Sequence, residues 1–238
     1  MVDFEQEYNK IVDKNSNKNP EELLDFIFQL HGNKVELASS FGAEDVVIIH
    51  MIQNLGLSIP IFTIDTGRLN QETYNLIDEI RNKYNIKIEI LFPNNVDVET
   101  MVQEKGMNLF YKSVENRQLC CNVRKVIPLE KKLSNLDAWI TGLRKNQNEN
   151  RSNFKKIEID IRRKTILKYN PLIDWSFEQV FDYIKKNNVP YNKLHDLNYP
   201  SIGCAPCTRG IKAGESPRAG RWWWENENNT ECGLHSKD

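Results

Sequence analysis

The feature that most limits the fold is an alternation of short apolar runs with longer amphipathic stretches. The runs are VELA, IPIFTID and IKIEILF, and the stretches between them are residues 43–56 and 68–85. Runs of this length are typical of buried strands, and the stretches between them are typical of helices. Strands joined through helices require right-handed crossovers and a parallel sheet that is covered on both faces. We therefore predict an α/β fold with helices on both faces of a parallel sheet.

The rest of the sheet is predicted from two later segments. DAWIT, at 137–141, has the pattern of another buried strand, whereas residues 156–172 alternate with period two like a β-hairpin. The sheet should therefore have a mixed edge, with an antiparallel strand. A further helix is expected over 174–188, where Ser176 and Gln179 have the spacing of a capping box.

Unusual loops follow three of the predicted strands. They are SSFGAED, DTGR and TGLRKNQNENR. Ligands of open α/β sheets bind at the carboxyl ends of the strands, so we expect these loops to form one site. SSFGAED has small residues leading into a helix, as phosphate-binding loops do, but it lacks their Gly-Lys-Ser/Thr ending. The alternative is an ordinary turn, with Ser40 or a neighbour as N-cap and with Glu44 and Asp45 favouring the positive end of the helix dipole.

Five cysteines constrain the chemistry of the chain. The first residues, MVDFEQEYNK, lack a secretory signal, and no apolar run approaches the roughly 20 residues of a membrane helix, so we expect a soluble cytoplasmic protein without a membrane partner. Disulfide frameworks are rare in the reducing cytosol, and an odd number of cysteines leaves one unpaired. Metal binding or redox chemistry is therefore the leading hypothesis.

Two pairs of cysteines have the spacing of metal ligands. Cys120 and Cys121 are adjacent, whereas Cys204 and Cys207 form a Cys-x-x-Cys pair. A zinc ion would need both adjacent sulfurs on one atom, which is awkward, and zinc sites usually space their ligands further apart. An iron-sulfur cluster offers each thiolate a different iron atom. The spacing favours a cluster, and zinc or four buried thiols without a metal remain alternatives.

The charges of the chain point to a local anion site. With 32 basic and 33 acidic residues the formal charge is −1, which argues against a nucleic-acid partner bound through bulk positive charge. Basic residues nevertheless lie near the cysteines in sequence. They are Arg124, Lys125, Arg209, Arg218 and Arg221. Such residues would hold an anionic cluster or a phosphate-bearing substrate, although each alone could be a solvated surface residue.

The end of the chain carries a lone cysteine and three consecutive tryptophans. Cys232, followed by His235, suits a nucleophile whose thiolate is stabilised by a nearby cation, and its alternative is an inert thiol. The tryptophans of GRWWWE are costly to expose, so they should pack the tail against the core, cover a cluster or make a subunit contact.

Taken together, these segments resemble the iron-sulfur branch of the phosphoadenylyl-sulfate reductase family, the assimilatory adenylyl-sulfate reductases. The resemblance runs in order from about Val35 to His235. It rests on SSFGAEDVVIIH, TIDTGR, FYKSVENRQLCCNVRK, ITGLR, NPLIDW, LHDLNYPSIGCAPCTRG, GESPRAGRWWWE and ECGLH. It implies an adenine-nucleotide-hydrolase-like fold with a cysteine-bearing C-terminal tail. We expect residues 1–215 to bind nucleotide and cluster, and residues 216–238 to form a mobile segment that carries the nucleophile.

The resemblance also implies a reaction. A 4Fe-4S cluster would be bound by Cys120, Cys121, Cys204 and Cys207. The Cys232 thiolate would attack the sulfur of adenosine 5'-phosphosulfate and release AMP, leaving an S-sulfocysteine. Thioredoxin, or a glutaredoxin-like donor, would then release sulfite. The electrons come from thiols, so the cluster need not change its oxidation state.

Substrate-binding residues are implied by position in the family's motifs. The nucleotide loop would contribute Ser39, Ser40, Gly42, Glu44 and Asp45, and the loop beside it Asp65, Thr66 and Gly67. The arginine loop would contribute Gly142, Leu143, Arg144 and Arg151. Lys125 would lie between cluster and substrate, and the remaining contacts would come from Arg218, Arg221 and His235. The chain departs from the usual arginine loop at two positions, Lys145 and Asn148, and lysine offers a point charge where arginine offers a planar fork.

Three alternatives to this function stay open at the level of sequence. The enzyme could also use 3'-phosphoadenylyl sulfate. The chain could be a zinc-stabilised nucleotide-binding protein with an inert tail. It could also be an ATP-pyrophosphatase-type ligase, although SSFGAED matches the usual Ser-Gly-Gly-x-Asp-Ser poorly. We further expect a homo-oligomer.

Overall fold

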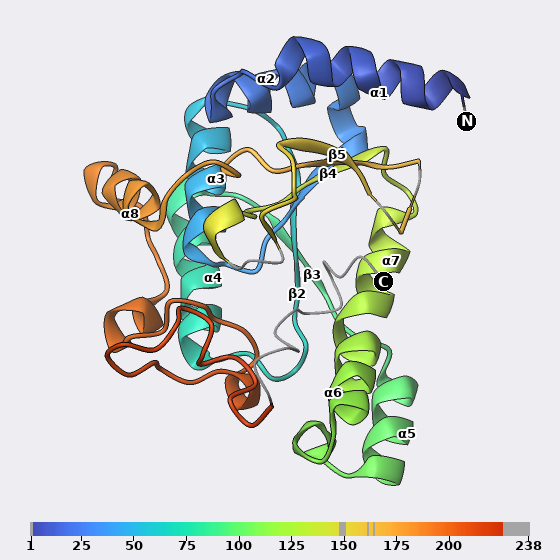
Figure 1. The fold of residues 1–238 in the computed structure, drawn as a ribbon, viewed down its shortest axis with the longest axis vertical. Helices are drawn as coiled ribbons and strands as arrows, with labels where there is room; N and C mark the ends of the chain where they lie inside the picture. Colours follow the sequence, from blue (N-terminus) through green and yellow to red (C-terminus); the bar gives the residue numbers. More distant parts are fainter. Residues whose placement is uncertain (1, 148–150, 161, 164, 226–238) are drawn as a thin grey trace.

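Six strands form one sheet at the centre of the computed structural model, which describes residues 2–147, 151–160, 162–163 and 165–225 (Figure 1). They are β1 (Val35–Ala38), β2 (Ile61–Ile64), β3 (Ile88–Leu91), β4 (Ala138–Ile140), β5 (Ile157–Ile159) and β6 (Leu167–Tyr169). Their order across the sheet is β3-β2-β1-β4-β6-β5. Only the pair of β5 with β6 is antiparallel among these strands, so both the parallel sheet and its mixed edge are confirmed.

The central strand β1 is buried because both neighbours pair with it. Leu37 lies opposite Ile61 of β2 and Ile140 of β4, and all three side chains are buried. Glu36, between Val35 and Leu37, is also buried, and its carboxylate pairs with Lys132 at 2.8 Å, so the strand is covered on both faces. The runs of β1 and β2 therefore belong to the core of the molecule, whereas in β3 only Ile88 is buried.

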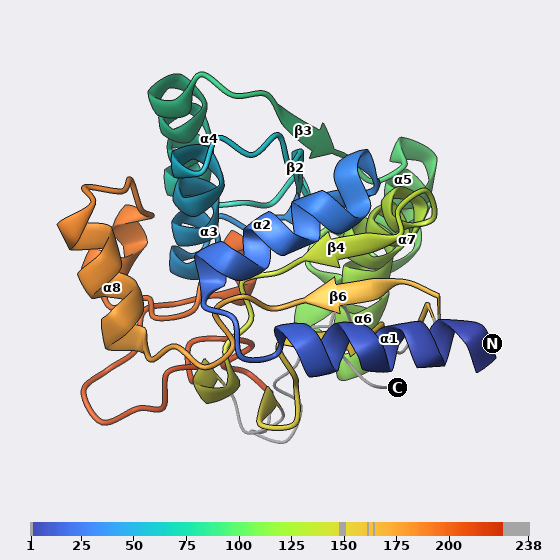
Figure 2. The same cartoon turned by 90° about the horizontal axis from the view of Figure 1, so that it is seen from above.

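Helices cover the sheet on both faces (Figures 1 and 2). On one side lie α3 (Ala43–Asn54), α4 (Gln71–Tyr84) and α8 (Phe177–Lys186); on the other lie α5 (Asn95–Lys105), α6 (Val114–Cys121) and α7 (Ile127–Leu133). The first two helices, α1 (Val2–Asn15) and α2 (Pro20–His31), lie across the end of the molecule opposite α5 and the start of α6 (Figure 1). Short 3₁₀ segments in the described residues include Gly32–Lys34, Leu109–Tyr111, Lys145–Gln147, Lys193–Leu197 and Ala205–Cys207.

Local sequence explains where several helices begin and end. The predicted capping box of α8 is present, because Ser176 Oγ accepts from the Gln179 N–H and Gln179 Oε1 accepts from the Ser176 N–H. The predicted cap of α3 is different: its N-cap is Gly42, which has no side chain to accept a hydrogen bond. Ser40 bonds to Asp45 instead. Gly56, at φ +66°, lies just beyond the end of α3, as expected for a glycine that follows a helix.

A π-helical segment, Asn122–Val126, joins α6 to α7. The three elements follow one another without a break in helical backbone, and the π segment begins directly after Cys121. Because a π turn holds an extra residue, it changes the direction in which the following side chains point, and such segments are frequent at functional sites. Arg124 and Lys125 both lie in it.

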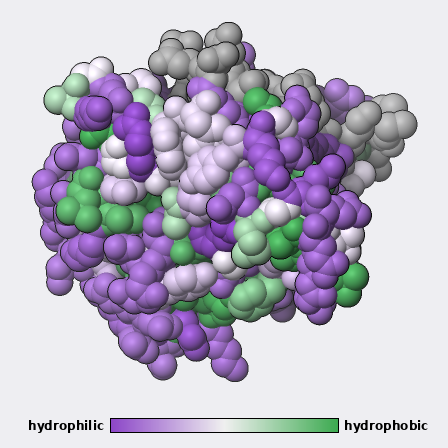
Figure 3. Space-filling view, turned by 90° about the horizontal axis from the view of Figure 1, so that it is seen from below, coloured by the Kyte–Doolittle hydropathy of each residue, from purple (hydrophilic) through white to green (hydrophobic). Residues whose placement is uncertain are grey.

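One face of the molecule is mainly polar. On the face seen from below the view of Figure 1, hydrophilic side chains dominate and apolar groups form separate patches (Figure 3). No helix in the described part of the chain is both long and apolar enough to cross a membrane.

Candidate metal centre and active site

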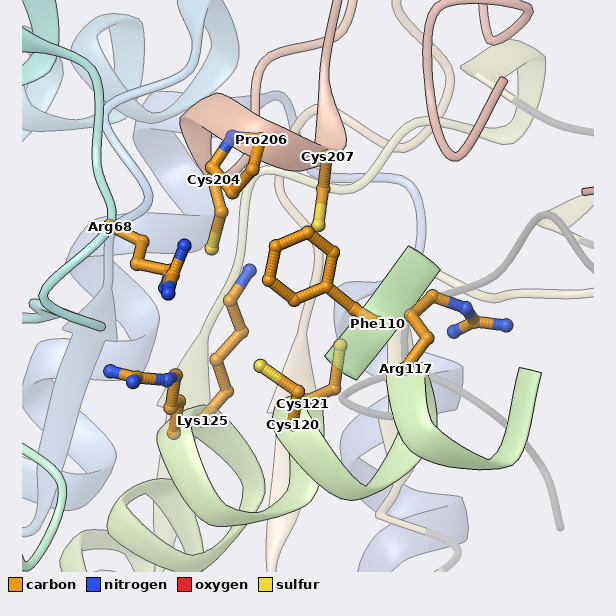
Figure 4. Close-up of a pocket in the computed structure, with 10 residues that line it drawn as sticks. Arg68, Phe110, Arg117, Cys120, Cys121, Lys125, Cys204, Pro206 and Cys207 are labelled. Carbon is orange, nitrogen blue, oxygen red and sulfur yellow. The ribbon is translucent and has the colours of Figure 1, made fainter. Parts of the chain in front are cut away.

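Four cysteines from two distant segments line one recess. Cys120 and Cys121 come from the end of α6, and Cys204 and Cys207 flank the 3₁₀ turn Ala205–Cys207. The empty space at the recess, including the part that is open to solvent, is about 310 Å³. Figure 4 shows the two pairs facing each other across it. The structure thus brings together all four predicted cluster ligands.

Hydrogen bonds of the backbone hold the two cysteine segments in place. Ser113 is the N-cap of α6, and its side-chain Oγ accepts from the Asn116 N–H at 3.2 Å. The Cys204 carbonyl accepts from the Cys207 N–H at 2.9 Å, which closes the turn between the two thiols. The Ala205 N–H donates to the carbonyl of Arg68 at 2.8 Å and thereby fixes this turn to the loop after β2.

Cations surround the four thiols. The residues that line the recess include Arg68, Arg117, Arg124 and Lys125. The Lys125 side chain extends into the space between the two pairs of cysteines (Figure 4). Arg124 Nη1 donates to the carbonyl of Thr66 at 2.6 Å, so its guanidinium is held at the wall of the recess. This concentration of positive charge suits an anionic occupant.

Burial alone disfavours thiolates in this recess. It raises the pKa of the Cys207 thiol to about 12, with a further rise from nearby Cys204, against which Lys125 and Arg221 act. Burial also raises the pKa of Cys120, and Arg124 and Arg68 oppose that rise. A bound metal centre would stabilise the thiolates more strongly than these cationic side chains do, because a thiol that coordinates a metal loses its proton.

The donor set fits a 4Fe-4S cluster. Four cysteine thiols are the usual ligands of such clusters, and here all four are free of disulfides and line the same recess. The buried Arg124 Nε has no hydrogen-bond partner within the described residues, so an N–H donor is left over at the wall. An anionic cluster with sulfur acceptors would satisfy it.

One predicted substrate residue, from the loop beside the nucleotide loop, lies against a cysteine of the recess. Thr66 is 1% exposed, and its Oγ1 lies 3.3 Å from Cys204 Sγ. Its hydroxyl also accepts from the Arg68 N–H at 3.2 Å. Gly67, at φ +69°, allows the tight turn between these residues. The loop after β2 is therefore built around a cysteine of the recess.

Four lining residues were not given a role from the sequence: Arg68, Phe110, Arg117 and Pro206. Arg68 could have been found, because it closes the DTGR motif. Its guanidinium lies 5.2 Å from the Phe110 ring centroid and donates to the Met107 carbonyl at 2.6 Å. Phe110 and Arg117 belong to the segment FYKSVENRQLCCNVRK, but they lie outside the loops at the strand ends, and only the cysteines and basic residues after them were given a role.

The other predicted loops meet at the carboxyl ends of β1, β2 and β4, which are neighbours in the sheet. Asp45 Oδ2 accepts from the Ser40 N–H at 2.6 Å and from Ser40 Oγ at 2.8 Å. Gly142 of the arginine loop packs against the same carboxylate, because a Cβ there would lie 2.3 Å from Asp45 Oδ1. The close approach of the two loops depends on this glycine.

An ion pair also joins these two loops. Arg144 Nε lies 2.6 Å from Glu44 Oε1, and both side chains are largely buried. Gln147 Oε1 accepts from the Arg144 N–H at 3.2 Å and from the Arg151 guanidinium. Burial raises the pKa of Asp45 to about 6 despite its hydrogen bonds to Ser40. The loops therefore hold buried charges beside one another.

Several predicted substrate residues have structural contacts within their own loops. Ser39 Oγ accepts from the Phe41 N–H at 3.1 Å, and Asp65 Oδ1 accepts from the Gly67 N–H at 2.7 Å and from the Tyr74 hydroxyl at 2.9 Å. The Leu143 side chain is packed in a small apolar cluster. These contacts shape the loops, and the substrate contacts of the three residues stay predictions.

The two predicted arginines near the C-terminus differ in how the structure holds them. Arg221 Nη1 lies 3.3 Å from Ser201 Oγ and 3.4 Å from the Ile202 carbonyl, and a Cβ at Gly203 would lie 2.4 Å from its guanidinium. Arg218 lies 6.0 Å from the Trp222 ring centroid. Thr208 and Arg221 form an antiparallel bridge, which places this segment against the second cysteine pair.

A family model described as the phosphoadenosine phosphosulfate reductase domain matches residues 34–210. The chain belongs to this family. Relatives named adenosine 5'-phosphosulfate reductase include one from Burkholderia cepacia, 48% identical over 85% of this chain and 81% of its own length. Another, from Agrobacterium fabrum, is 47% identical over 89% of this chain and 81% of its own length.

Solved structures of this family and of others share the fold. The crystal structure of a phosphoadenylyl-sulfate reductase from Candida auris has a TM-score of 0.71, at 29% identity over 85% of this chain and 96% of that one. An NH3-dependent NAD synthetase from Campylobacter jejuni has a TM-score of 0.52 at 13% identity, covering 81% of this chain and 78% of that one. The latter likeness concerns the fold alone. Membership of the reductase family replaces the ligase hypothesis.

Three residues of the sequence-based account lie outside the described part of the chain. They are Cys232, His235 and Asn148. The predicted nucleophile and tail histidine therefore rest on the match of ECGLH to the motif of the family. Lys145, the other departure in the arginine loop, is described: its Nζ lies 2.7 Å from Asp174 Oδ1 at the surface.

Proposed function

We propose that the chain is an adenylyl-sulfate reductase of sulfate assimilation that converts adenosine 5'-phosphosulfate to sulfite and AMP. One observation of the structure carries the proposal. Four cysteines line a cation-rich recess beside the loops at the carboxyl ends of the strands, where α/β sheets bind ligands. The proposal is supported by the relatives of the chain that are named for this activity.

In this proposal Cys120, Cys121, Cys204 and Cys207 hold a 4Fe-4S cluster. When bound, the cluster would place a localised charge beside the substrate. The electrons of the reaction come from thiols. Lys125 extends between the cysteine pairs from the π segment, so its ammonium is placed to face both the cluster and an anionic substrate (Figure 4). Arg124 and Arg68 keep the recess electropositive.

The chemistry takes place in two displacements at sulfur. The Cys232 thiolate attacks the sulfur of the substrate, the bond from sulfur to the bridging oxygen breaks, and that oxygen leaves with AMP. A thiolate of thioredoxin, or of a glutaredoxin-like donor, then attacks Cys232 Sγ, and sulfite leaves with the electron pair of the broken S–S bond. The second thiol of the donor then attacks the mixed disulfide and frees Cys232. One dithiol is thereby oxidised to a disulfide for each sulfate group reduced.

The substrate lies across the loops in this proposal. Ser39, Ser40, Gly42, Glu44 and Asp45 form the nucleotide loop, with Asp65, Thr66 and Gly67 beside it. The arginine loop contributes Gly142, Leu143, Arg144 and Arg151. Arginines suit a phosphosulfate because the planar guanidinium pairs with two oxygens at once, and Arg218, Arg221 and His235 complete the set. The Glu44–Arg144 pair supports the proposal, because it holds one arginine in a fixed orientation between two of these loops.

The C-terminal segment has to serve both half-reactions. We propose that residues 216–238 bring Cys232 to the substrate and afterwards present the S-sulfocysteine to the thiol donor. We also propose that the enzyme acts in the cytoplasm, where thioredoxin is kept reduced, and as a homo-oligomer.

The test is an assay of sulfite and AMP with reduced thioredoxin and purified protein. Both products should form in equal amounts, and Cys232→Ser should abolish their formation. Turnover by the Cys232→Ser variant would show that the nucleophile is wrong. Comparing kcat/KM for adenylyl sulfate and 3'-phosphoadenylyl sulfate decides the substrate, and equal values would replace our proposal with a dual-specificity reductase.

A further inference from the structure

A buried ion pair joins the last described residue of the chain to the helix that carries two cysteines. Arg117 Nε lies 2.7 Å from Glu225 Oε1, and the two side chains are only 3% and 5% exposed. Burying two charges costs desolvation energy, so such a pair is weak evidence for a gain in stability. A buried ion pair can instead fix one conformation of the chain. The Arg117–Glu225 pair lies where it would fix the residues before Glu225 against α6.

The pair is part of a stack around Trp222. The indole ring is 3% exposed, with the Arg117 guanidinium 4.5 Å from its centroid and the Arg221 guanidinium 4.8 Å from it. Trp222 has φ +48°, a left-handed conformation that bulky residues seldom adopt. Such a conformation persists only where the surroundings hold it, so the chain is constrained to reverse at this point.

The same turn is attached to both cysteine pairs. Arg117 precedes Cys120 and Cys121 by three and four residues on α6, so it lies on their face of the helix, and it lines the recess with them. The Trp222 N–H donates to the carbonyl of Cys207 at 3.2 Å. Residues 216–225, which we name the C-terminal arm, are thus held at the recess from two sides.

We propose that Arg117 is a positioning residue whose ion pair with Glu225 fixes the C-terminal arm for the attack by Cys232. This inference rests on the proposed function, and it assigns a role to two residues outside the predicted site. Cys232 follows Glu225 by seven positions, a length of chain that can span at most about 25 Å. Release of the arm lets Arg221 and the origin of the tail move, which lowers the fraction of molecules in which the thiol reaches the substrate.

The experiment compares Glu225→Gln with the parent protein in a single turnover without thioredoxin. Glutamine keeps the shape of the side chain and removes the charge. The rate at which adenylyl sulfate converts Cys232 to S-sulfocysteine should fall at least tenfold, whereas iron and sulfide per chain and the affinity for AMP should stay at the parent's values. Arg117→Lys keeps the positive charge but loses the planar guanidinium that stacks on Trp222. Its rate should lie between the rates of the parent and of Glu225→Gln.

A matched control separates positioning from simple destabilisation. Asp160→Asn breaks another buried ion pair, with Arg163 at 3.0 Å, in which the side chains are 6% and 14% exposed. It should lower Tm and leave the single-turnover rate of the folded protein unchanged. The inference is overturned if Glu225→Gln reacts at the parental rate, if its loss of rate only follows a loss of iron, or if the control slows the reaction equally.

A second measurement does not depend on the reaction. Amide hydrogen exchange of residues 216–225 should be at least tenfold faster in Glu225→Gln than in the parent, with little change in the sheet. If exchange in the C-terminal arm is unchanged, the ion pair does not hold the arm in place, and the inference is overturned. If the parent itself forms no S-sulfocysteine, the proposed function fails, and the exchange experiment still decides whether the ion pair holds the arm.

Discussion

Substituting alanine for Gly142 tests whether the nucleotide and arginine loops are locked together as the structure indicates. The new Cβ would lie 2.3 Å from Asp45 Oδ1 and 2.9 Å from Glu44 Cβ, against the ~3.5 Å at which non-bonded atoms normally rest. The carboxylate resists displacement because Ser40 bonds to it through both its N–H and its hydroxyl. We expect a loss of about 2 kcal/mol in the free energy of unfolding, within the usual range of overpacking. For a chain of this size the loss corresponds to a fall in Tm of about 4–8 °C.

Gly42→Ala is the matched control in the same pair of loops. Its Cβ would meet its nearest neighbours at 3.6 Å, an ordinary contact, and the backbone there has φ −70°. Both variants gain the same benefit from a stiffer unfolded chain, and Gly42→Ala also gives up glycine at the N-cap of α3, which costs about 1 kcal/mol or less, so a larger loss in Gly142→Ala reports the clash. Thermal unfolding followed by circular dichroism measures it. If Gly142→Ala melts within ~2 °C of Gly42→Ala, the close packing of the loops against Asp45 is refuted.

Three further predictions concern the cluster, a buried carboxylate and the departure in the arginine loop. Cys120→Ser should lose most of its iron and labile sulfide, whereas Cys232→Ser should keep both; a colourless parent with one bound zinc would favour the zinc-stabilised alternative. Burial raises the pKa of Asp45 to about 6, so protonation stabilises the fold fully below about pH 4, and this contribution is lost as pH rises through 6. The Tm of Asp45→Asn relative to the parent should therefore rise between pH 4 and pH 7, and a constant difference would contradict the shift. Lys145→Arg should change kcat/KM by less than about threefold, because Lys145 forms an exposed pair with Asp174 and such pairs contribute little; a tenfold gain would show that this position grips the substrate.

The sheet could be predicted because its signal is local. Each predicted strand is a short apolar run, and the antiparallel edge is visible in the period-two alternation of residues 156–172. The π segment after Cys121 has no such signal, because the extra residue in a helical turn leaves no distinct apolar pattern. The direction in which Arg124 and Lys125 point therefore became visible only in the structure.

The candidate site divides in the same way. The cysteines and the loops at the strand ends were predicted, since adjacent thiols and glycine-rich turns are unusual in themselves. The contact of Thr66 with Cys204 joins residues far apart in the chain, and so does the Arg117–Glu225 pair. No sequence motif at one residue of either pair indicates its partner. Pairings of this kind depend on the packed fold, which a single sequence does not reveal.

The most direct test of the account is to incubate the purified protein anaerobically with adenosine 5'-phosphosulfate, without a thiol donor, and to map the modified residue by mass spectrometry. We predict one added SO3 group on Cys232, with an equal amount of AMP released and the cluster absorption unchanged. Thioredoxin should then remove the group as sulfite. An unmodified chain, or an adduct on Cys120, Cys121, Cys204 or Cys207 in place of Cys232, would contradict it.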